Sequence, residues 1–361
     1  MRSMLTKAAL LLLVSSHLGT AGAAYAQSDT KAAPIVIEKQ GSFSAGGRTI
    51  ATPGTFNNNA PSQEGQSIHG DHLYAFYQIP QNPKPYPIVM LHGAFQSGRS
   101  WETTPDGREG FQTIFLRRAF PVYIVDQPRR GRAGNSTVGA TIDPTPYDQL
   151  FFDQFRIGIW PNYYDNVQFD RDPKTLDQFL SSVTPNTGPY DPGVISDAVS
   201  ALFDRIGAGI LFTHSQGGGP GWLTAIKNPN VKGVVAFEPG SGFIFPEGEA
   251  PQPMPSAAGT LSAETVPLSE FEKLTRIPIV IYYGDNFPTE PTKDRGQDNC
   301  CVRLAMAKLW VDAVNKHGGD AGLVHLPDIG IHGNTHFLFS DLNNVEIADL
   351  VSKFLDDKKL D

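Results

Sequence analysis

The stretch ILFTHSQGGGPGW, residues 210–222, joins an apolar run to three consecutive glycines through Ser215. A nucleophilic serine of this kind stands on a sharp turn between a strand and a helix, and small neighbours let the helix begin close to the strand. The stretch fits the pattern G-x-S-x-G except at its first position, which is Thr213. Because a serine after a strand is also a common helix cap, the stretch by itself leaves two interpretations of Ser215, a nucleophile or a cap.

Apolar runs on both sides of Ser215 predict a mostly parallel sheet. They are continuously apolar, which is typical of strands buried on both faces. The six runs are YPIVMLHGAF (86–95), FPVYIVDQP (120–128), GILFTHSQG (209–217), KGVVAFEPG (232–240), IPIVIYYGDN (277–286) and AGLVHLPDIG (321–330). Segments with helical periodicity lie among them, at 191–207, 301–319 and 344–355. We therefore predict an α/β fold, a doubly wound, mostly parallel sheet flanked by helices, with its active site at the carboxyl ends of the strands.

Two long segments interrupt this alternation of strands and helices. Residues 137–190 are rich in aromatic side chains, which favours a cap packed over the site; the alternative is that the rings only cover an edge of the sheet. Residues 240–275 are rich in proline and are expected to form a second loop excursion. With these insertions, residues 27–361 are predicted to be a single domain. Its first part, up to residue 60, is polar around one short strand candidate at 34–39.

The amino terminus has the pattern of a cleavable signal peptide. Arg2 and Lys7 form a basic region, an apolar segment follows from Ala8 to Val14, and Ala24-Tyr25-Ala26 fits the A-x-A cleavage signal. We predict cleavage after Ala26 and export of residues 27–361 to a bacterial periplasm or beyond. A membrane anchor is disfavoured because the apolar segment is too short to span a bilayer, and no later segment of the mature chain is long enough.

Charge and cysteine content narrow the classes of partner. The formal net charge is −8 and becomes −10 without residues 1–26, which argues against nucleic acid and anionic membranes as partners. The two cysteines, Cys300 and Cys301, are adjacent; they form either a strained vicinal disulfide or two reduced thiols near the start of a helix. This spacing does not fit a zinc site. The sequence implies no metal and no organic cofactor, and it does not predict the oligomeric state.

The backbone amides of Ala94 and Gln216 are candidates for an oxyanion hole. The sequence LHGAF (91–95) ends an earlier predicted strand, and the amide of Ala94 follows its His-Gly turn. Gln216 comes directly after the candidate nucleophile, at a helix N-terminus whose partial positive charge favours an oxyanion.

Two histidines and two acids are candidates to complete a triad with Ser215. His332 and His336 lie in GIHGNTHF, in the loop after the last predicted strand, and either satisfies the chain order serine, acid, histidine. Asp285 follows the strand that commonly provides the acid, whereas Glu238 follows the strand after Ser215. Either acid could orient a histidine and stabilise its charged form. A lone glutamate at the end of a buried strand is unusual, because an ionised carboxylate there needs a partner.

Several of these motifs together resemble a family of secreted bacterial carboxylesterases with the α/β-hydrolase fold. The resemblance covers roughly residues 70–356 and is carried by LHGAF, SWETTPDGREGFQTIFLRRAFPVYIVDQPRRGRAG, THSQGG, FEPG and IGIHGNTHFLFSDLNNVEIADLV. Members of that family also lack glycine at the position of Thr213. Their oxyanion loop reads His-Gly-Cys-Cys with a vicinal disulfide, whereas this chain has His92-Gly93-Ala94-Phe95.

The resemblance implies a Ser-His-Glu triad of Ser215, His336 and Glu238, with the acid after the sixth strand. We therefore expect a periplasmic or secreted serine hydrolase that cleaves small-molecule carboxylic esters through an acyl-enzyme. A lactonase, an amidase or a polyester depolymerase would use the same motifs. A non-catalytic, hydrolase-like protein that binds a small ligand is the alternative from a different class. A dehalogenase or epoxide hydrolase is disfavoured because Ser215 stands where an aspartate would be needed.

Overall fold

The computed structural model describes residues 33–288 and 292–361, so the predicted signal peptide and its cleavage site lie outside the described residues. Residues Ile35–Asp361 form one compact unit. None of the helices in the described ranges is both long and apolar enough to cross a membrane.

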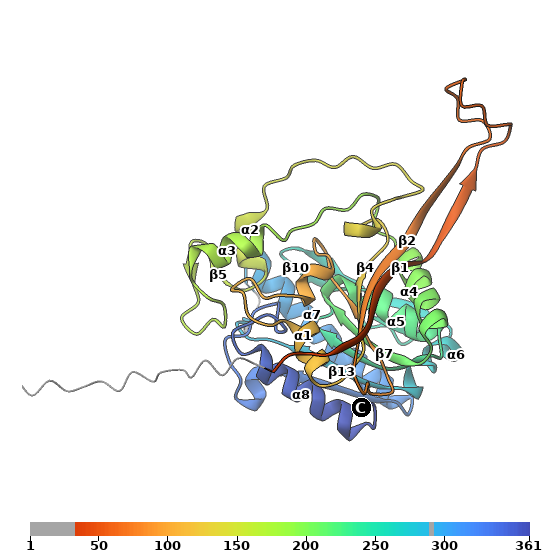
Figure 1. Cartoon of the computed structure of the whole chain (residues 1–361). Coiled ribbons are helices and arrows are strands. Elements are labelled where there is room, and N and C mark those ends of the chain that lie inside the picture. Colours follow the sequence, from red (N-terminus) through yellow and green to blue (C-terminus); the bar gives the residue numbers. More distant parts are fainter. Residues whose placement is uncertain (1–32, 289–291) are drawn as a thin grey trace, which may run out of the picture. The chain divides into compact units, whose positions relative to one another are not determined.

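A sheet of eight strands organises this unit, in the order β1-β2-β4-β3-β7-β8-β13-β14 (Figure 1). Its strands are β1 (Ile37–Ala51), β2 (Ser67–Pro80), β3 (Ile88–Leu91), β4 (Val122–Asp126), β7 (Gly209–His214), β8 (Val231–Phe237), β13 (Pro278–Tyr283) and β14 (Asp320–His325). The last six are the six apolar runs, and each of them pairs in parallel with its neighbours among the six. The predicted α/β fold with a mostly parallel sheet is confirmed.

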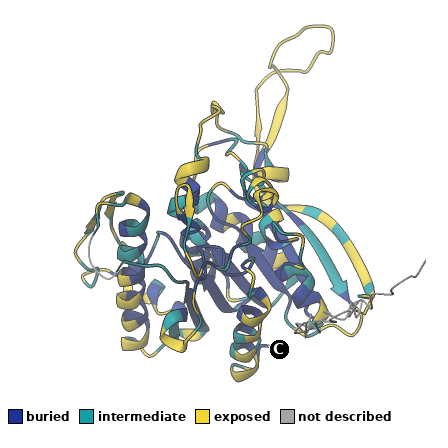
Figure 2. Ribbon diagram, turned by 90° about the vertical axis from the view of Figure 1, so that its left-hand side faces the viewer, coloured by how far each residue is buried: buried dark blue, intermediate teal, exposed yellow. Residues whose placement is uncertain are grey.

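Helices cover both faces of the sheet. Side chains of β3 alternate between the two faces: Val89 and Leu91 belong to one buried cluster, Ile88 and Met90 to the other. The first cluster includes side chains from α4 (Pro192–Ile206), α5 (Gly218–Lys227) and α7 (Arg295–Lys316). The second includes side chains from α1 (Phe111–Arg117) and α8 (Asn344–Asp357). Figure 2 shows the buried strands between helices whose outer sides are exposed.

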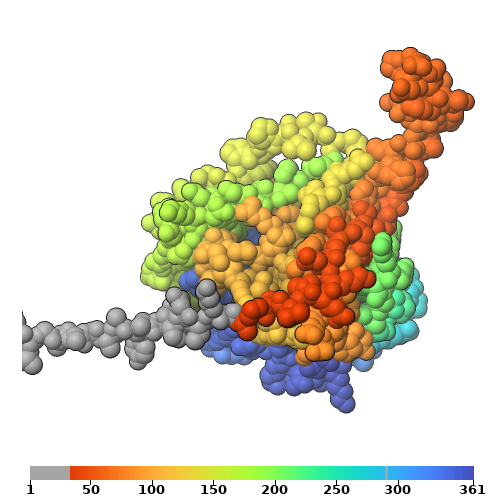
Figure 3. Space-filling model, in the orientation of Figure 1, coloured from red at the N-terminus to blue at the C-terminus, as the bar shows by residue number. Residues whose placement is uncertain are grey.

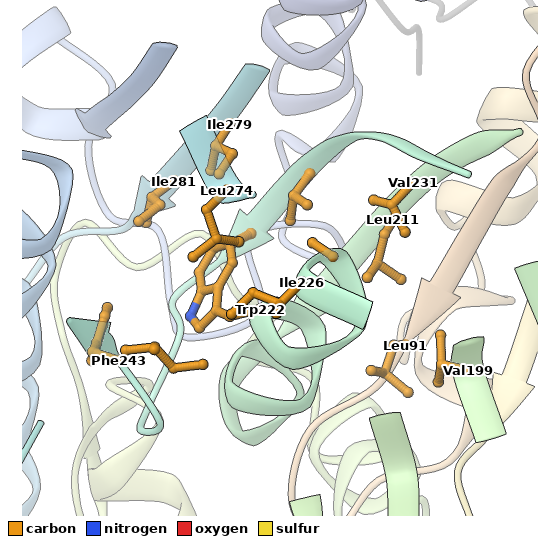
Figure 4. Packing of buried hydrophobic residues seen from close by; sticks show 14 of the residues in the cluster. Leu91, Val199, Leu211, Trp222, Ile226, Val231, Phe243, Leu274, Ile279 and Ile281 are labelled. Atoms are coloured by element: carbon orange, nitrogen blue, oxygen red, sulfur yellow. The ribbon is translucent and has the colours of Figure 1, made fainter. Parts of the chain in front are cut away.

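Trp222 of α5 packs at the centre of the first cluster. Its ring lies 4.4 Å from that of Trp310 in α7, measured between centroids. Figure 4 shows Trp222 among aliphatic side chains of β7, β8 and β13. Burying a large aromatic pair of this kind fixes α5 against the sheet, and α5 is the helix that begins just after Ser215.

The first two strands differ from the prediction of one short strand at 34–39. β1 is 15 residues long and pairs antiparallel with β2, from Ile37 opposite Pro80 to Ala51 opposite Ser67. Figures 1 and 3 show the far end of this hairpin standing clear of the neighbouring elements. The glycines and polar residues of β1 give no strand pattern in the sequence. The strand is held by its backbone pairing with β2 and not by a buried apolar face.

Both predicted insertions contain regular structure. Residues 137–190 hold α2 (Asp148–Gln154), β5 (Gly158–Ile159), β6 (Asn162–Tyr163) and α3 (Pro173–Leu180). The segment expected to be a second loop excursion, 240–275, is instead built from short paired elements: β9 (Ile244–Pro246), β10 (Met254–Ser256), β11 (Gly259–Leu261), β12 (Glu264–Val266) and α6 (Leu268–Phe271). Strands of three residues give too short a pattern to be recognised in a proline-rich sequence.

Candidate active site

The candidate residues gather where the strand order reverses. From β3 the chain passes to β4 on one side and later returns to β7 on the other side of β3. In open α/β sheets, ligands bind at the carboxyl ends of the strands beside such a reversal. His92 follows β3 directly, and Ser215 follows β7.

Ser215 stands on a tight turn between β7 and α5. Its φ angle is 52°, in the left-handed region that residues with side chains rarely adopt. The next glycines allow close packing of this turn: a Cβ on Gly217 would lie 2.7 Å from the carbonyl oxygen of His92, and one on Gly218 would lie 2.7 Å from Cβ of Pro239. The local sequence therefore builds the strand-turn-helix geometry that the G-x-S-x-G pattern predicts.

Thr213 is accommodated by a glycine on the far side of the turn. A Cβ on Gly221 would lie 2.6 Å from Cγ2 of Thr213, and both residues are buried. The methyl group of Thr213 thus occupies space that Gly221 leaves open. This packing explains how the motif tolerates a larger residue at its first position.

Gly221→Ala is therefore expected to destabilise the protein by about 1–3 kcal/mol, the usual cost of overpacking, although alanine favours a helix by about 1 kcal/mol. Thr213→Ser removes Cγ2 and should recover most of that loss in the double variant. Urea unfolding of the two single variants and the double variant measures their coupling. Additive effects of the two substitutions would contradict this packing.

His336 and Glu238 form a direct, buried pair. Nδ1 of His336 lies 2.5 Å from Oε2 of Glu238, and the two side chains are 9% and 2% exposed. The ring of His336 stacks on that of Phe155, with 5.2 Å between centroids and 3° between planes. Its backbone N–H also donates to the carbonyl oxygen of Phe155, at 2.9 Å. Residues 137–190 thus contribute directly to the orientation of His336.

Arg156 is the buried counter-charge of Glu238, and it was not among the candidate residues predicted from the sequence. Its guanidinium donates to Oε1 of Glu238, and its Nε donates to the carbonyl oxygen of Asp285 at 2.7 Å. The N–H of Gly284 donates to the same Oε1 at 2.8 Å. Oε2 remains for His336. The requirement of a buried carboxylate for a partner was the only signal in the sequence, and it did not indicate which cation would meet it.

These contacts set the charges of the pair. Burial alone would raise the pKa of Glu238, but Arg156 and the hydrogen bond to His336 lower it to about 2. Burial lowers the pKa of His336, against the opposing hydrogen bond and charge of Glu238. Near neutral pH, Glu238 is therefore ionised and the imidazole of His336 is neutral.

The alternative acid and the alternative histidine contact each other instead. Nδ1 of His332 lies 3.3 Å from Oδ2 of Asp285, and the His332 side chain is 57% exposed. The carboxylate of Asp285 also accepts the N–H groups of Gly333 at 2.8 Å and Asn286 at 2.6 Å. Through these hydrogen bonds, Asp285 connects the loop before His336 to the end of β13.

The loop after β3 approaches the back of the Ser215 turn. A Cβ on Gly93 would lie 2.8 Å from Cβ of Ser215, so only glycine permits this contact. Nδ1 of His92 lies 2.9 Å from the carbonyl oxygen of Gly93, and Nη1 of Arg130 donates to the same oxygen at 2.7 Å. Ala94 follows in this loop, and within the described chain its amide donates no hydrogen bond. The Gln216 amide lies in the first turn after Ser215.

His214 links this loop to the loop of His336. Its Nδ1 lies 3.0 Å from Oε1 of Gln96, and its Nε2 lies 2.9 Å from the carbonyl oxygen of His336. Burial holds the pKa of His214 well below its ordinary value, so the ring is neutral. We assign it to fixing the relative position of the two loops.

Ser215, His336 and Glu238 line one small pocket of about 40 Å³. The rest of its lining comes from residues 137–190, from the end of β13 and from α7. These residues are Gln154, Phe155, Tyr283, Cys300 and Arg303. A larger pocket of about 370 Å³ is lined in part by Phe179 and Phe337, and contains none of the three candidate triad residues.

The adjacent cysteines lie within α7, and Cys300 is a buried thiol. Of the two states considered in the sequence, the structure shows a reduced thiol at Cys300. Sγ of Cys300 lies 3.2 Å from Nη1 of Arg156, so the thiol packs against the cation that neutralises Glu238.

The family model described as "Alpha/beta hydrolase family" matches residues 88–340, which include Ser215, Glu238 and His336. The chain belongs to this family.

Two similar proteins extend the comparison for this alpha/beta hydrolase. A protein named "Probable secreted lipase phiG", from Fungal sp. (strain ATCC 74256), is 30% identical over 321 residues, covering 77% of this chain and 84% of its own length. A solved structure described as that of a novel bacterial esterase has a TM-score of 0.73 and 28% identity, covering 91% of this chain and 98% of its own.

Proposed function

We propose that this alpha/beta hydrolase is an exported serine esterase that cleaves small carboxylic esters with Ser215, His336 and Glu238. The observation that carries the proposal is the 2.5 Å contact between His336 and Glu238 at the wall of the pocket that contains Ser215. The names of the two relatives, a lipase and an esterase, support the choice of substrate class.

In this mechanism the neutral imidazole of His336 accepts the hydroxyl proton as Ser215 attacks the ester carbonyl. Glu238 accepts the hydrogen bond from Nδ1–H and stabilises the imidazolium that forms. The amides of Ala94 and Gln216 would bind the oxyanion, and His336 then gives its proton to the departing alcohol. Water then attacks the acyl-enzyme while His336 accepts its proton. His336 returns this proton to Oγ of Ser215 as the carboxylic acid leaves.

The rate should rise with pH as His336 loses its proton, because only the neutral ring is a base. Since burial lowers the pKa of His336, the midpoint of kcat/KM for p-nitrophenyl acetate is expected below the ordinary value of 6.5. Glu238→Gln removes a negative charge that raises this pKa, so its residual activity should have a still lower midpoint. A profile measured from about pH 4 to 8 checks both statements. A wild-type midpoint above 6.5 would contradict the assignment.

A panel of substrates tests the proposed activity. The purified mature protein is assayed on ethyl, phenyl and p-nitrophenyl esters, and on lactones, amides and polyester oligomers of matched acyl length. The proposal expects the highest kcat/KM on esters of small acids. Faster turnover of lactones, amides or polymers would instead assign the protein to the corresponding class of hydrolase. Binding of these compounds without turnover of any of them would support the non-catalytic alternative.

Export is proposed on the amino-terminal pattern and is supported by the secreted lipase among the relatives. Expression of the full chain in a bacterium, followed by mass spectrometry of the periplasmic fraction and the medium, tests it. A mature protein that begins at Gln27 is expected. Full-length protein confined to the cytoplasm would contradict the proposal.

A further inference from the structure

Arg303 places a positive charge at the wall of the pocket that contains Ser215. It projects from α7, one turn after Cys300, and both side chains line the pocket. Arg303 and Ser215 approach Gly240 from the same side. A Cβ on Gly240 would lie 3.4 Å from Nε of Arg303 and 3.5 Å from Oγ of Ser215. The guanidinium is therefore within reach of a short substrate bonded to Ser215.

Backbone carbonyls hold Arg303 in this position. Its Nε donates to the carbonyl oxygen of Gly240 at 2.5 Å, and its Nη1 donates to that of Asn299 at 3.1 Å. These bonds fix the direction of the guanidinium without neutralising it. Across residues 33–288 and 292–361, no carboxylate lies within ion-pair distance of Arg303, and its Nη2 makes no hydrogen bond.

The other charges of the pocket already balance. Both oxygens of Glu238 are engaged, Oε1 by Arg156 and Gly284 and Oε2 by His336. Arg156 is fully buried behind this carboxylate. The positive charge of Arg303 is therefore not neutralised by another residue of the pocket. An anionic group of a substrate in this pocket can accept a charge-assisted hydrogen bond from it.

We propose that Arg303 selects esters that carry a carboxylate near the scissile bond, such as half-esters of short dicarboxylic acids. The small volume of the pocket suits a compact anion. Because Nε of Arg303 and Oγ of Ser215 lie within 3.4 and 3.5 Å of the same point, the two atoms are at most about 7 Å apart, a separation that a carboxylate two to three carbons from the reacting carbonyl can span. This inference rests on the proposed esterase function and names its substrate class.

Matched substrates test the proposal. Monoethyl succinate carries the carboxylate on the acyl side, and ethyl 4-methylpentanoate replaces that carboxylate by an uncharged group of the same shape. A third substrate, butanoyloxyacetate, carries the anion on the alcohol side, with isobutyl butanoate as its neutral partner. The measured quantity is the ratio of kcat/KM for each anionic ester to that for its neutral partner.

The wild-type ratio is expected to exceed one for at least one pair, and Arg303→Gln should lower it by about 10- to 100-fold, mainly through KM. Arg303→Lys keeps the charge and should retain part of the preference. Arg276→Gln, which removes an arginine outside this pocket, should leave the ratio unchanged. Succinate should inhibit hydrolysis of the neutral ester by the wild type, and more weakly in Arg303→Gln.

An equal loss on charged and neutral esters in Arg303→Gln would mean that Arg303 only supports the Gly240 loop, and it would overturn the proposal. A wild-type ratio at or below one for both pairs would also overturn it. These results differ from a failure of the esterase function itself, in which the wild type would hydrolyse none of the four esters.

Discussion

Ser215→Ala is expected to lower kcat for p-nitrophenyl acetate by about 10⁴- to 10⁶-fold, the range seen when a hydrolase loses its nucleophile. Ser215 is the group that bonds to the acyl carbon, and its neighbours cannot replace it, since His336 and Glu238 act through its hydroxyl. The variant should fold normally, because it deletes one oxygen at the wall of a pocket. Steady-state kinetics and urea unfolding measure the two quantities.

Ser44→Ala is the matched control, because Ser44 is an exposed serine on β1. It should have wild-type kcat. Activity of Ser215→Ala within about tenfold of the wild type would remove Ser215 from the mechanism, since a loss that small corresponds to about 1.4 kcal/mol of barrier.

Glu238→Gln should reduce kcat by about 10⁴-fold, because an amide cannot hold the required tautomer of His336 or stabilise its charged form. It should also destabilise the fold, since it leaves Arg156 buried without a counter-charge, a change that typically costs about 3–5 kcal/mol. Kinetics therefore need to be measured on the folded fraction, determined by circular dichroism. Retention of near wild-type kcat would contradict the role of this carboxylate.

Asp285→Asn provides the direct comparison. Asp285 contacts the exposed His332 rather than His336, so its replacement should reduce kcat far less. The matched histidine variants follow the same order: His336→Ala should lose nearly all activity and His332→Ala should keep most of it. The reverse order in either pair would transfer the triad role to Asp285 or His332.

The core of the fold could be predicted because most of its strands are buried on both faces. Such strands must be continuously apolar, and the apolar runs of this kind correspond to β3, β4, β7, β8 and β13, while the sixth run corresponds to the half-buried edge strand β14. The long β1–β2 hairpin could not be predicted in this way. Much of β1 is exposed, so its sequence carries neither an apolar run nor a clear alternation.

The candidate site was only partly visible in the sequence for a different reason. The turn at Ser215 has a local pattern, and the sequence contained both acids and both histidines. Which acid meets which histidine depends on the ends of β8 and β13, and the residues alone left that choice open. Only the resemblance to a known family favoured Glu238 and His336.

Contacts between segments that are distant in the chain could not be predicted from the sequence. Arg156 reaches Glu238 from the insertion, and no periodicity marks one arginine among many as buried. The pairing of Thr213 with Gly221 is similar, because a departure from the motif at one position is compensated by a glycine two turns away. Both features follow from packing in three dimensions and not from spacing along the chain.

The nucleophilic role of Ser215 is tested most directly by covalent labelling. The mature protein is treated with a fluorophosphonate, digested, and analysed by peptide mass spectrometry, with Ser215→Ala and His336→Ala treated in parallel. We expect a single adduct on Ser215, none in Ser215→Ala, and much slower labelling in His336→Ala, because the hydroxyl then lacks its base. No adduct on the wild type, or an adduct that persists in Ser215→Ala, would contradict the account.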